Sequence, residues 1–389
     1  MSPDFELLVV GGGPAGLSAV RGFRDAGGEG RVAIVSDEHR MPYRRPPLTK
    51  ELLRGEISED ELPLEDETWL AKNGVSLVSG RAVALDVAAH EVSLSGGRQL
   101  TYACCVLSTG SEPTRLPVRG ADDPSVRVVR SLDHVRELLH RLSPGGEVIV
   151  IGSGFIGCEI AASLRRRDAS VTLVSDEPAP NGGRLGARAG AEIARWLRDE
   201  GVRLELGVAV EAIERHGQLL RVSAGSTSVT GSLVVMAAGV APRSELLLAY
   251  GTPLEDGAIP VDASMRTALP DLFAAGDVCK AENATAGRSL RVEHWGDALA
   301  QGEVAGRAAA RERAEWGEVP GFWSTIGGHT LKYAAWGDGY DESRFESPSG
   351  GGFVVWYGRD EHIVGVLTHR ADEQYERGRR LIEEGAPWA

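Results

Sequence analysis

Apolar runs followed by spaced glycines recur at two places in the chain. FELLVVGGGPAGLSAV (5–20) has an apolar stretch, a glycine-rich turn and a second apolar stretch, and EVIVIGSGFIGCEIAASL (147–164) repeats this order. A short apolar run bounded by glycine is typical of a buried strand, and the run that follows the glycines has the composition of a helix start. Each stretch therefore predicts a strand, a tight turn and a helix.

A second predicted strand follows each of these units. VAIVSDE (32–38) and VTLVSDE (171–177) end in the same four letters, so acidic side chains stand about 20 residues beyond each glycine motif. A lone glycine pattern is a weak signal, but the strand, the helix and the acid complete the dinucleotide-binding fingerprint. The chain is therefore predicted to bind two dinucleotides.

The spacing of the glycines has a physical reason. The first glycine permits the tight turn, the second lets the backbone approach a pyrophosphate, and the third lets the helix pack closely on the strand. The helix N-terminus then faces the negative charge of the phosphates. An acid at the end of the second strand can accept hydrogen bonds from ribose hydroxyls. The glycines concerned are Gly11, Gly13 and Gly16 in the first copy and Gly152, Gly154 and Gly157 in the second.

The remaining pattern completes two α/β units and adds a different C-terminal part. Further apolar strands are predicted in 102–120, 233–247 and 265–279, and 294–314 has helical periodicity. After Pro320 the chain alternates between aromatic and polar residues, which predicts antiparallel strands ended by a short helix near 371–384. The predicted fold is α/β, with two Rossmann-like dinucleotide-binding domains and a C-terminal α+β domain.

Composition narrows the class of protein. The chain has 389 residues and a net charge of −14, which argues against general nucleic-acid binding because that requires a basic surface. We expect no secretory signal and no membrane-spanning segment. The four cysteines have no zinc or disulfide spacing, so we expect a cytoplasmic protein without a metal site.

Specific motifs in the chain resemble those of a known family. They run from residue 11 to about 324 and are GGGPAGLSAV, PYRRPPLTK, STGSEP, VIVIGSGFIGCEIAA, LFAAGDVC, VEHWGDALAQG and VPGFWS. The chain is similar to the FAD-dependent pyridine-nucleotide reductases, in the branch of NAD(P)H ferredoxin and rubredoxin reductases, to which apoptosis-inducing factor is related. The resemblance implies a discontinuous FAD-binding domain (1–112 and 246–318), an NAD(P)H-binding domain (113–245) and a C-terminal domain (319–389).

The resemblance also implies site residues. For FAD they are Gly11, Gly13, Pro14, Ala15 and Gly16 at the pyrophosphate, Asp37 or Glu38 at the ribose, Arg45 and Lys50 from PYRRPPLTK, a backbone contact at Val83, Thr109, Gly110, Arg130, Asp277 at the ribityl chain, His294 and Trp295 along the flavin ring, and Trp323. For the nicotinamide coenzyme they are Gly152, Gly154, Phe155, Ile156, Gly157, Glu159, Asp176 and Gly239.

Lys50 and Glu159 are the catalytic residues that the resemblance implies. In the family a loop lysine pairs with a glutamate of the second glycine motif beside the flavin, which accepts hydride from the nicotinamide ring. A cation there would stabilise negative charge on the reduced ring, and a carboxylate would offset the cost of burying that cation. The alternatives are a solvated loop lysine and an exposed glutamate.

The cysteines separate branches of this fold. Disulfide reductases need a redox cysteine after the first glycine motif, and this chain has PYRRPPLTK there and no cysteine before Cys104. Cys104, Cys105 and Cys158 are interpreted as core residues, and a reactive thiol at Cys279 stays open as an alternative. Electrons are therefore expected to leave singly to a ferredoxin that supplies an oxygenase.

Several alternatives stay open. Asp176 would repel a 2′-phosphate and the next arginine is Arg184, so NADH is favoured over NADPH. The segment 326–343 departs from the family pattern, which could change the face that docks the electron acceptor. The protein could instead reduce a small molecule directly, or act as a redox-sensing interaction protein like apoptosis-inducing factor. Either a monomer or a homodimer is possible.

Overall fold

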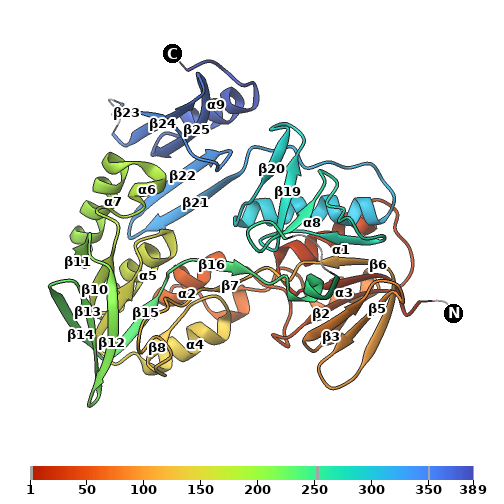
Figure 1. The fold of residues 1–389 in the computed structure, drawn as a ribbon, viewed down its shortest axis with the longest axis horizontal. Coiled ribbons are helices and arrows are strands. Elements are labelled where there is room, and N and C mark those ends of the chain that lie inside the picture. The colour runs from red at the N-terminus through yellow and green to blue at the C-terminus, as the bar shows by residue number, and fades with distance from the viewer. Residues whose placement is uncertain (1–2, 251–253, 349–350, 389) are drawn as a thin grey trace.

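Two sheets, each built around one of the strands that precede the glycine motifs, form the two halves of the molecule (Figure 1). The computed structural model describes residues 3–250, 254–348 and 351–388. The strands and helices fall in the predicted order, so the prediction of an α/β fold with two dinucleotide-binding units is confirmed. No helix in the described part of the chain has the length and hydropathy that crossing a membrane requires.

The sheet of the first half combines parallel and antiparallel strands. β1 lies between β2 and β6 and runs parallel to both, which brings the carboxyl ends of these strands to one edge. β5 and β4 continue the sheet in antiparallel order, and β18 pairs with β6. The bounds are β1 Phe5–Val10, β2 Val32–Ser36, β3 Val75–Ser79, β4 Ala82–Asp86, β5 Glu91–Leu94, β6 Gln99–Leu107 and β18 Leu272–Ala274.

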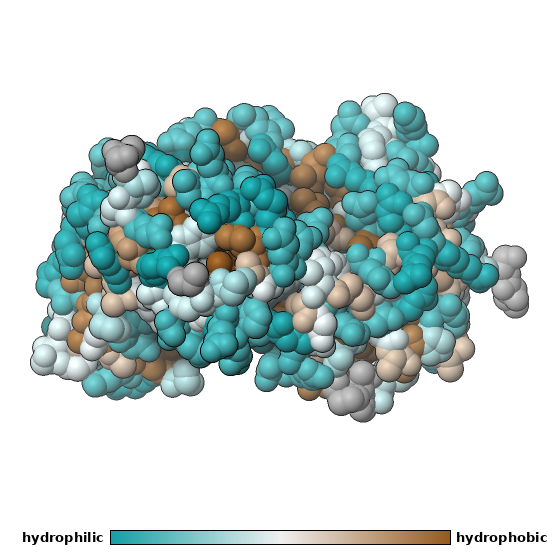
Figure 2. Space-filling view, turned by 90° about the horizontal axis from the view of Figure 1, so that it is seen from above, coloured by the Kyte–Doolittle hydropathy of each residue, from teal (hydrophilic) through white to brown (hydrophobic). Residues whose placement is uncertain are grey.

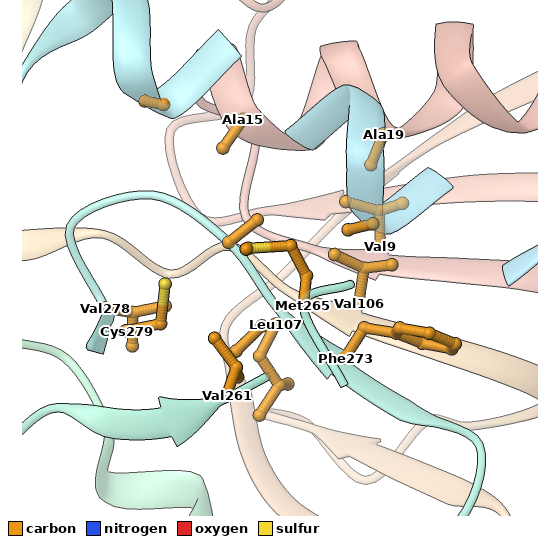
Figure 3. Close-up of a cluster of buried hydrophobic side chains, with 14 of the residues drawn as sticks. Val9, Ala15, Ala19, Val106, Leu107, Val261, Met265, Phe273, Val278 and Cys279 are labelled. Carbon is orange, nitrogen blue, oxygen red and sulfur yellow. The ribbon is translucent and has the colours of Figure 1, made fainter. Parts of the chain in front are cut away.

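Small residues let two helices of this half pack closely. Helix α1 (Pro14–Asp25) lies beside helix α8 (Trp295–Ala309), as Figure 1 shows. A Cβ on Gly306 would lie 1.9 Å from the carbonyl oxygen of Ala19, so only glycine allows this approach. Below the helices, side chains from β1, β6 and β18 meet in an apolar core (Figure 3). The predicted helix within 294–314 is thereby confirmed as α8.

The sheet of the second half is parallel throughout. β9 lies between β10 and β15, and β11 and β8 flank them. Helix α5 follows β9 directly, as the glycine motif predicts. The bounds are β8 Val126–Arg127, α4 Leu132–Arg141, β9 Glu147–Ile151, α5 Phe155–Arg165, β10 Ser170–Ser175, α6 Gly182–Leu185, α7 Ala187–Asp199, β11 Arg203–Leu206 and β15 Leu233–Met236.

Smaller sheets complete the two halves. An antiparallel sheet of β12, β13 and β14 covers the second half, and β17, β19 and β20 pair beside the first. The strands β7 and β16 form a short antiparallel ribbon between the halves. The bounds are β7 Ser111–Pro113, β12 Val210–His216, β13 Leu219–Ala224, β14 Thr227–Gly231, β16 Val240–Pro242, η3 Glu245–Tyr250, β17 Ile259–Val261, β19 Cys279–Asn283 and β20 Arg288–Leu290.

The C-terminal part is an antiparallel sheet with one helix, as predicted. The strand order is β21-β22-β25-β24-β23, and helix α9 (Asp372–Glu383) packs on β25 and β22. Apolar side chains of β22, β24 and β25 join the core of the second half, so this sheet is held against that half. The strands are β21 Gly321–Ile326, β22 His329–Ala335, β23 Glu342–Glu346, β24 Phe353–Arg359 and β25 His362–His369.

The PYRRPPLTK segment forms local structure within the first half. Pro46–Thr49 is a short 3-10 helix, η1, and Glu51–Arg54 is a helical turn, α2. Leu48, Leu52 and Leu53 join the core cluster of the second half, and α2 packs on α5. The segment therefore bridges the two halves. The bounds of the remaining short elements are η2 Glu59–Glu61 and α3 Glu67–Lys72.

Candidate active site

A large cavity of about 2080 Å³ lies between the two halves and the C-terminal sheet. Both glycine motifs, the Pro46–Lys50 stretch and the strand β21 contribute to its wall. Seen from above, apolar side chains gather near the middle of the molecule, between the halves (Figure 2). The cavity thus joins the two predicted dinucleotide sites in one space.

Most of the residues predicted from the sequence line this cavity. They are Gly11, Gly13, Pro14, Ala15, Asp37, Glu38, Arg45, Lys50, Thr109, Gly110, Arg130, Gly152, Gly154, Phe155, Ile156, Glu159, Asp176, Gly239, Asp277, His294, Trp295 and Trp323. Gly16 and Gly157 lie behind the wall, where each helix meets its strand. Val83 lies outside the wall with 56% of its surface exposed, whereas its neighbour Ala82 lines the cavity.

The two glycine turns form matching backbone cradles. Gly11 has φ +125° and Gly152 has φ +102°, values that side chains other than hydrogen rarely allow. A Cβ on Gly11 would lie 2.1 Å from the carbonyl oxygen of Ser108, and one on Gly152 would lie 2.3 Å from that of Ala237. Helices α1 and α5 begin without a side-chain cap, so their first N–H groups remain for an anion. Both cradles fit the pyrophosphate of a dinucleotide.

The acid of the first unit is held in a network. Glu38 accepts hydrogen bonds from Arg45 Nη2 and from the Tyr43 hydroxyl, each at 2.5 Å. Arg45 Nη1 also donates to the carbonyl oxygen of Arg130 at 2.9 Å. Burial, reinforced by the nearby Glu38 carboxylate, raises the pKa of Tyr43 to about 12, so its hydroxyl stays protonated as a donor. The PYRRPPLTK arginine therefore reaches the acid at the end of β2.

Asp277, also in the cavity wall, accepts a second set of hydrogen bonds. Its Oδ2 atom accepts hydrogen bonds from Arg130 Nη2 and from the Ser111 hydroxyl, both at 2.7 Å. Asp277 and Ser111 are buried, so these bonds replace the hydration of the carboxylate. Arg130, which comes from the second half, is thereby tied to the segment that follows β18.

Lys50 and Glu159 form a buried ion pair, with 3.2 Å between Nζ and Oε2. The exposed fractions of the two residues are 5% and 3%. The same Oε2 accepts a hydrogen bond from the Thr49 hydroxyl at 2.5 Å, and Oε1 accepts one from the Ser324 hydroxyl at 2.8 Å. The alternatives of a solvated lysine and an exposed glutamate are therefore wrong.

Aromatic residues stand beside this pair. The Phe322 ring lies 4.6 Å from the Phe155 ring and 4.7 Å from the His294 ring, measured between centroids. His294 Nδ1 lies 3.1 Å from a carboxylate oxygen of the buried Asp297, which orients the imidazole. Trp323 lines the cavity with 46% of its surface exposed. Aromatic side chains of β21, α5 and α8 therefore contribute apolar surface to the cavity wall, which a planar ring could contact.

Two acids stand at the end of β10 in the second unit. Asp176 is exposed, whereas Glu177 is half-buried and accepts a hydrogen bond from Gly183 N at 3.3 Å and one from the Ser153 hydroxyl at 3.4 Å. Both residues line the cavity. The repeated letters VSDE place Glu177 at the position that Glu38 has in the first unit, and this repeat is the signal that could have identified Glu177.

The four cysteines all lie outside the cavity wall. Cys105, Cys158 and Cys279 are buried, and Cys104 is half-buried in β6. Burial raises the pKa of Cys279 to about 12, and its thiol contacts the carbonyl oxygen of Gly276. Figure 3 shows Cys279 within a cluster of buried apolar side chains. The geometry therefore gives no dithiol at the site and argues against a reactive Cys279.

Several site residues were not predicted from the sequence. Thr49, Ser111, Glu177, Arg243 and Ser324 line the cavity, and each contacts another of its wall residues. Thr49 and Ser324 lie inside the motifs PYRRPPLTK and VPGFWS. The motifs therefore indicated the segments that form the site, but they did not predict the hydrogen bonds of these two residues.

Fold and site together define a class of protein. Two dinucleotide cradles that face one cavity, with a buried lysine–glutamate pair between them, are those of an oxidoreductase that uses FAD and a nicotinamide coenzyme. The chain belongs to the pyridine nucleotide-disulphide oxidoreductase family, which it matches over residues 5–302.

Comparison with individual proteins agrees with this assignment. The chain is 32% identical to the 5,5'-dehydrodivanillate O-demethylase ferredoxin reductase subunit of Sphingobium sp., over 98% of this chain and 94% of that protein. The chain is 29% identical to human apoptosis-inducing factor 3 over 99% of its own length. The match covers 64% of that protein, so the chain spans just under two thirds of the length of this relative.

A solved structure has the same fold nearly throughout. The crystal structure of the covalent putidaredoxin reductase–putidaredoxin complex contains a chain that superimposes with a TM-score of 0.91 at 26% sequence identity. The match covers 99% of this chain and 94% of that one. The similarity therefore includes the C-terminal sheet as well as the two dinucleotide-binding units.

Proposed function

We propose that this protein transfers hydride from NADH to FAD and passes the electrons singly to a ferredoxin-type carrier that supplies an oxygenase. The observation that carries the proposal is the buried Lys50–Glu159 pair between the two cradles, in a cavity whose wall contains no cysteine in the part of the chain that the structure describes. The cofactors supply the redox chemistry, and the protein supplies orientation and electrostatics. Without a dithiol in the wall, a disulfide relay has no group to use.

The proposed FAD site is the cradle of the first unit. Gly11 and Gly13 would face the pyrophosphate, the acids Asp37 and Glu38 would face the ribose, and Asp277 would hold the ribityl chain. Arg45 would stand near the phosphates or adenine. The lining of one cavity by all of these residues supports the assignment. The domain boundaries predicted from the sequence are proposed unchanged, and the β7–β16 ribbon lies close to two of them.

The proposed coenzyme site is the cradle of the second unit, with NADH preferred over NADPH. Asp176 and Glu177 both stand at the end of β10, where their carboxylates would accept hydrogen bonds from a ribose and repel a 2′-phosphate. Arg184 also lines the cavity but lies beyond the short helix start at Gly182. The pair of acids supports the preference for NADH.

Lys50 is the proposed catalytic cation. A buried ammonium group beside the flavin ring would stabilise negative charge that develops there, because little water competes for it. Glu159 would hold the Lys50 side chain in place through their ion pair. His294, oriented by Asp297, would lie along the ring with Trp295 and Trp323.

The proposed electron acceptor rests on the similar proteins. The Sphingobium relative is named as a ferredoxin reductase subunit, and the solved complex contains putidaredoxin with its reductase. The free thiols of all four cysteines support the proposed location in a reducing cytoplasm. An acidic protein of net charge −14 would meet an acidic carrier through a local basic patch, so binding should weaken with salt.

Anaerobic stopped-flow spectroscopy tests the proposal. The purified protein should carry FAD, NADH should bleach its absorbance faster than NADPH, and an added ferredoxin should reoxidise it. Protein without FAD, or FAD that NADH leaves oxidised, would contradict the proposal. Reoxidation by quinones or oxygen but by no ferredoxin would favour a small-molecule reductase. Slow turnover with every acceptor, with NADH-dependent assembly, would favour a redox-sensing interaction protein.

A further inference from the structure

The Glu159 carboxylate is held by groups from all three parts of the molecule. Lys50 and Thr49 belong to the PYRRPPLTK segment of the first half, Glu159 belongs to α5 of the second half, and Ser324 belongs to β21 of the C-terminal sheet. The hydroxyls of Thr49 and Ser324 are both buried. One side chain is therefore the meeting point of three separate regions.

The two oxygens of the carboxylate have different partners. Oε2 receives the Lys50 ammonium group at 3.2 Å and the Thr49 hydroxyl at 2.5 Å, and Oε1 receives the Ser324 hydroxyl at 2.8 Å. Lys50 is the charged side chain that contacts Glu159 among the described residues. Because the Ser324 hydroxyl donates to Oε1, it limits rotation of the carboxylate about its last bond and leaves Oε2 for Lys50.

Ser324 itself is fixed by its strand. Along β21 the neighbouring Trp323 is exposed and Thr325 is half-buried, whereas Ser324 is 1% exposed and faces inward. Phe322, two positions earlier, packs on Phe155 at the start of α5. The strand is therefore pinned against α5 near Glu159, and it presents the Ser324 hydroxyl at a defined position.

We propose that Ser324 is a positioning residue for flavin reduction: its hydroxyl orients Glu159 toward Lys50, so that the docking of the C-terminal sheet sets the geometry of the ion pair. The inference rests on the proposed function. Thr49 acts on the same carboxylate from the other side. The Ser163 hydroxyl, which donates to the carbonyl oxygen of Thr49 at 2.7 Å, ties the PYRRPPLTK segment to α5.

The test is reduction of the FAD-loaded protein by NADH, with Ser324→Ala compared with the unsubstituted chain. The limiting reduction rate should fall about tenfold, which corresponds to about 1.4 kcal/mol and lies near the value of a hydrogen bond to a charged group. The Kd for NADH should stay within about twofold, because Ser324 acts on the rate through Glu159.

Matched variants separate positioning from a general loss of packing. Ser324→Thr keeps a hydroxyl and should restore most of the rate. Thr325→Val is the control on the same strand, because the Thr325 hydroxyl contacts Thr330 on the exposed side and lies outside the cavity wall. The double variant Thr49→Val with Ser324→Ala should be non-additive, since both hydroxyls act through one carboxylate.

The outcomes distinguish the inference from the proposed function. Failure of NADH to reduce the unsubstituted protein would overturn the function, and with it the inference. Normal reduction of the unsubstituted protein, with Ser324→Ala lowering the unfolding temperature but leaving the limiting reduction rate unchanged, would overturn the inference alone. Equal losses in Ser324→Ala and Thr325→Val would also overturn it.

Discussion

The two glycine motifs follow the same order in sequence, but the acidic side chains at the ends of their second strands have different surroundings. In the first unit both oxygens of Glu38 are occupied, one by Arg45 and the other by Tyr43. In the second unit the described contacts of Glu177 are long, at 3.3 and 3.4 Å, and its neighbour Asp176 is exposed. The acid of the first unit is thus already fixed by side chains of the protein, whereas the acids of the second unit remain available to a ligand. This difference suits a retained FAD and an exchangeable coenzyme.

The helices that follow the two motifs also differ in what covers them. Helix α1 is covered by α8 of its own half, through glycines that bring the two backbones into contact. Helix α5 is covered by α2 from the first half and by β21 from the C-terminal sheet. The helix of the first unit therefore packs against a helix of the same half. The helix of the second unit packs against both other parts of the molecule, and we call this contact of α5 with α2 and β21 the joint. Function at the joint should consequently be sensitive to changes in distant segments.

The largest effect is expected from Lys50→Met at this joint. The change leaves the Glu159 carboxylate buried without its cation, which should cost about 3–5 kcal/mol of the free energy of unfolding. Chemical denaturation of the FAD-loaded protein measures this loss, and flavin reduction should slow as well. Lys332→Met is the matched control, because the Lys332–Asp372 pair is exposed and should contribute less than about 1 kcal/mol. An equal loss of unfolding free energy in Lys50→Met and Lys332→Met would contradict the larger contribution expected from the buried pair.

The next effect compares the two cradles directly. Gly11→Ala and Gly152→Ala each place a methyl group against a carbonyl oxygen at positive φ, with an expected cost of about 2–4 kcal/mol. Gly11→Ala should yield protein without FAD, measured by its absorbance. Gly152→Ala should keep FAD but lose reduction by NADH. If both variants lost FAD to the same extent, the division of the two sites between two ligands would be wrong.

A smaller effect is expected at the acids. Glu177→Ala should lower the preference for NADH over NADPH about tenfold while the FAD content is unchanged, because a carboxylate that repels a 2′-phosphate is removed. Glu38→Gln should act on the opposite ligand, weakening FAD retention because it removes the negative charge and one of the two acceptor oxygens that Arg45 and Tyr43 use. Reduction rates over a series of coenzyme concentrations measure the first change, and FAD release on dilution measures the second. A change of coenzyme preference in Glu38→Gln would contradict the assignment.

The smallest effect concerns the contact between the second half and the C-terminal sheet. The Trp196 ring of α7 stacks on His329 at 4.4 Å and lies 4.8 Å from His369. Burial lowers the pKa of both histidines below the ordinary value of about 6.5. The unfolded chain therefore binds more protons below that pH, so the free energy of unfolding should fall as the pH falls through this range.

Denaturation with urea between pH 7.5 and 5.5 checks this expectation. His329→Gln should flatten the dependence on pH, since one of the two histidines no longer takes up a proton on unfolding. His216→Gln, at an exposed end of β12, is the control and should leave the slope unchanged. If neither variant changed the dependence of the unfolding free energy on pH, His329 would not be the cause of that dependence.

Much of the architecture was predictable from short stretches of sequence. The period of apolar residues and the glycine spacing gave both strand–turn–helix units, and alternation after Pro320 gave the C-terminal strands and helix α9. The buried pair of Lys50 with Glu159 was expected from the family resemblance, and the structure places the two side chains in contact. The position of Val83 and the roles of Thr49 and Ser324 were not available in this way, because they depend on which way a side chain points once separate segments have packed.

The sequence by itself determined two dinucleotide cradles and the lack of a redox cysteine beside the first of them. These features are local, because a tight turn at positive φ requires glycine and a buried strand requires consecutive apolar residues. Only the tertiary structure decided which side chains from separate segments contact the Glu159 carboxylate. Ser324 reaches Glu159 across 165 positions and Thr49 reaches it across 110, so no local pattern encodes these contacts. They exist because burial leaves the Glu159 carboxylate without water, and the packed segments must supply its hydrogen bonds.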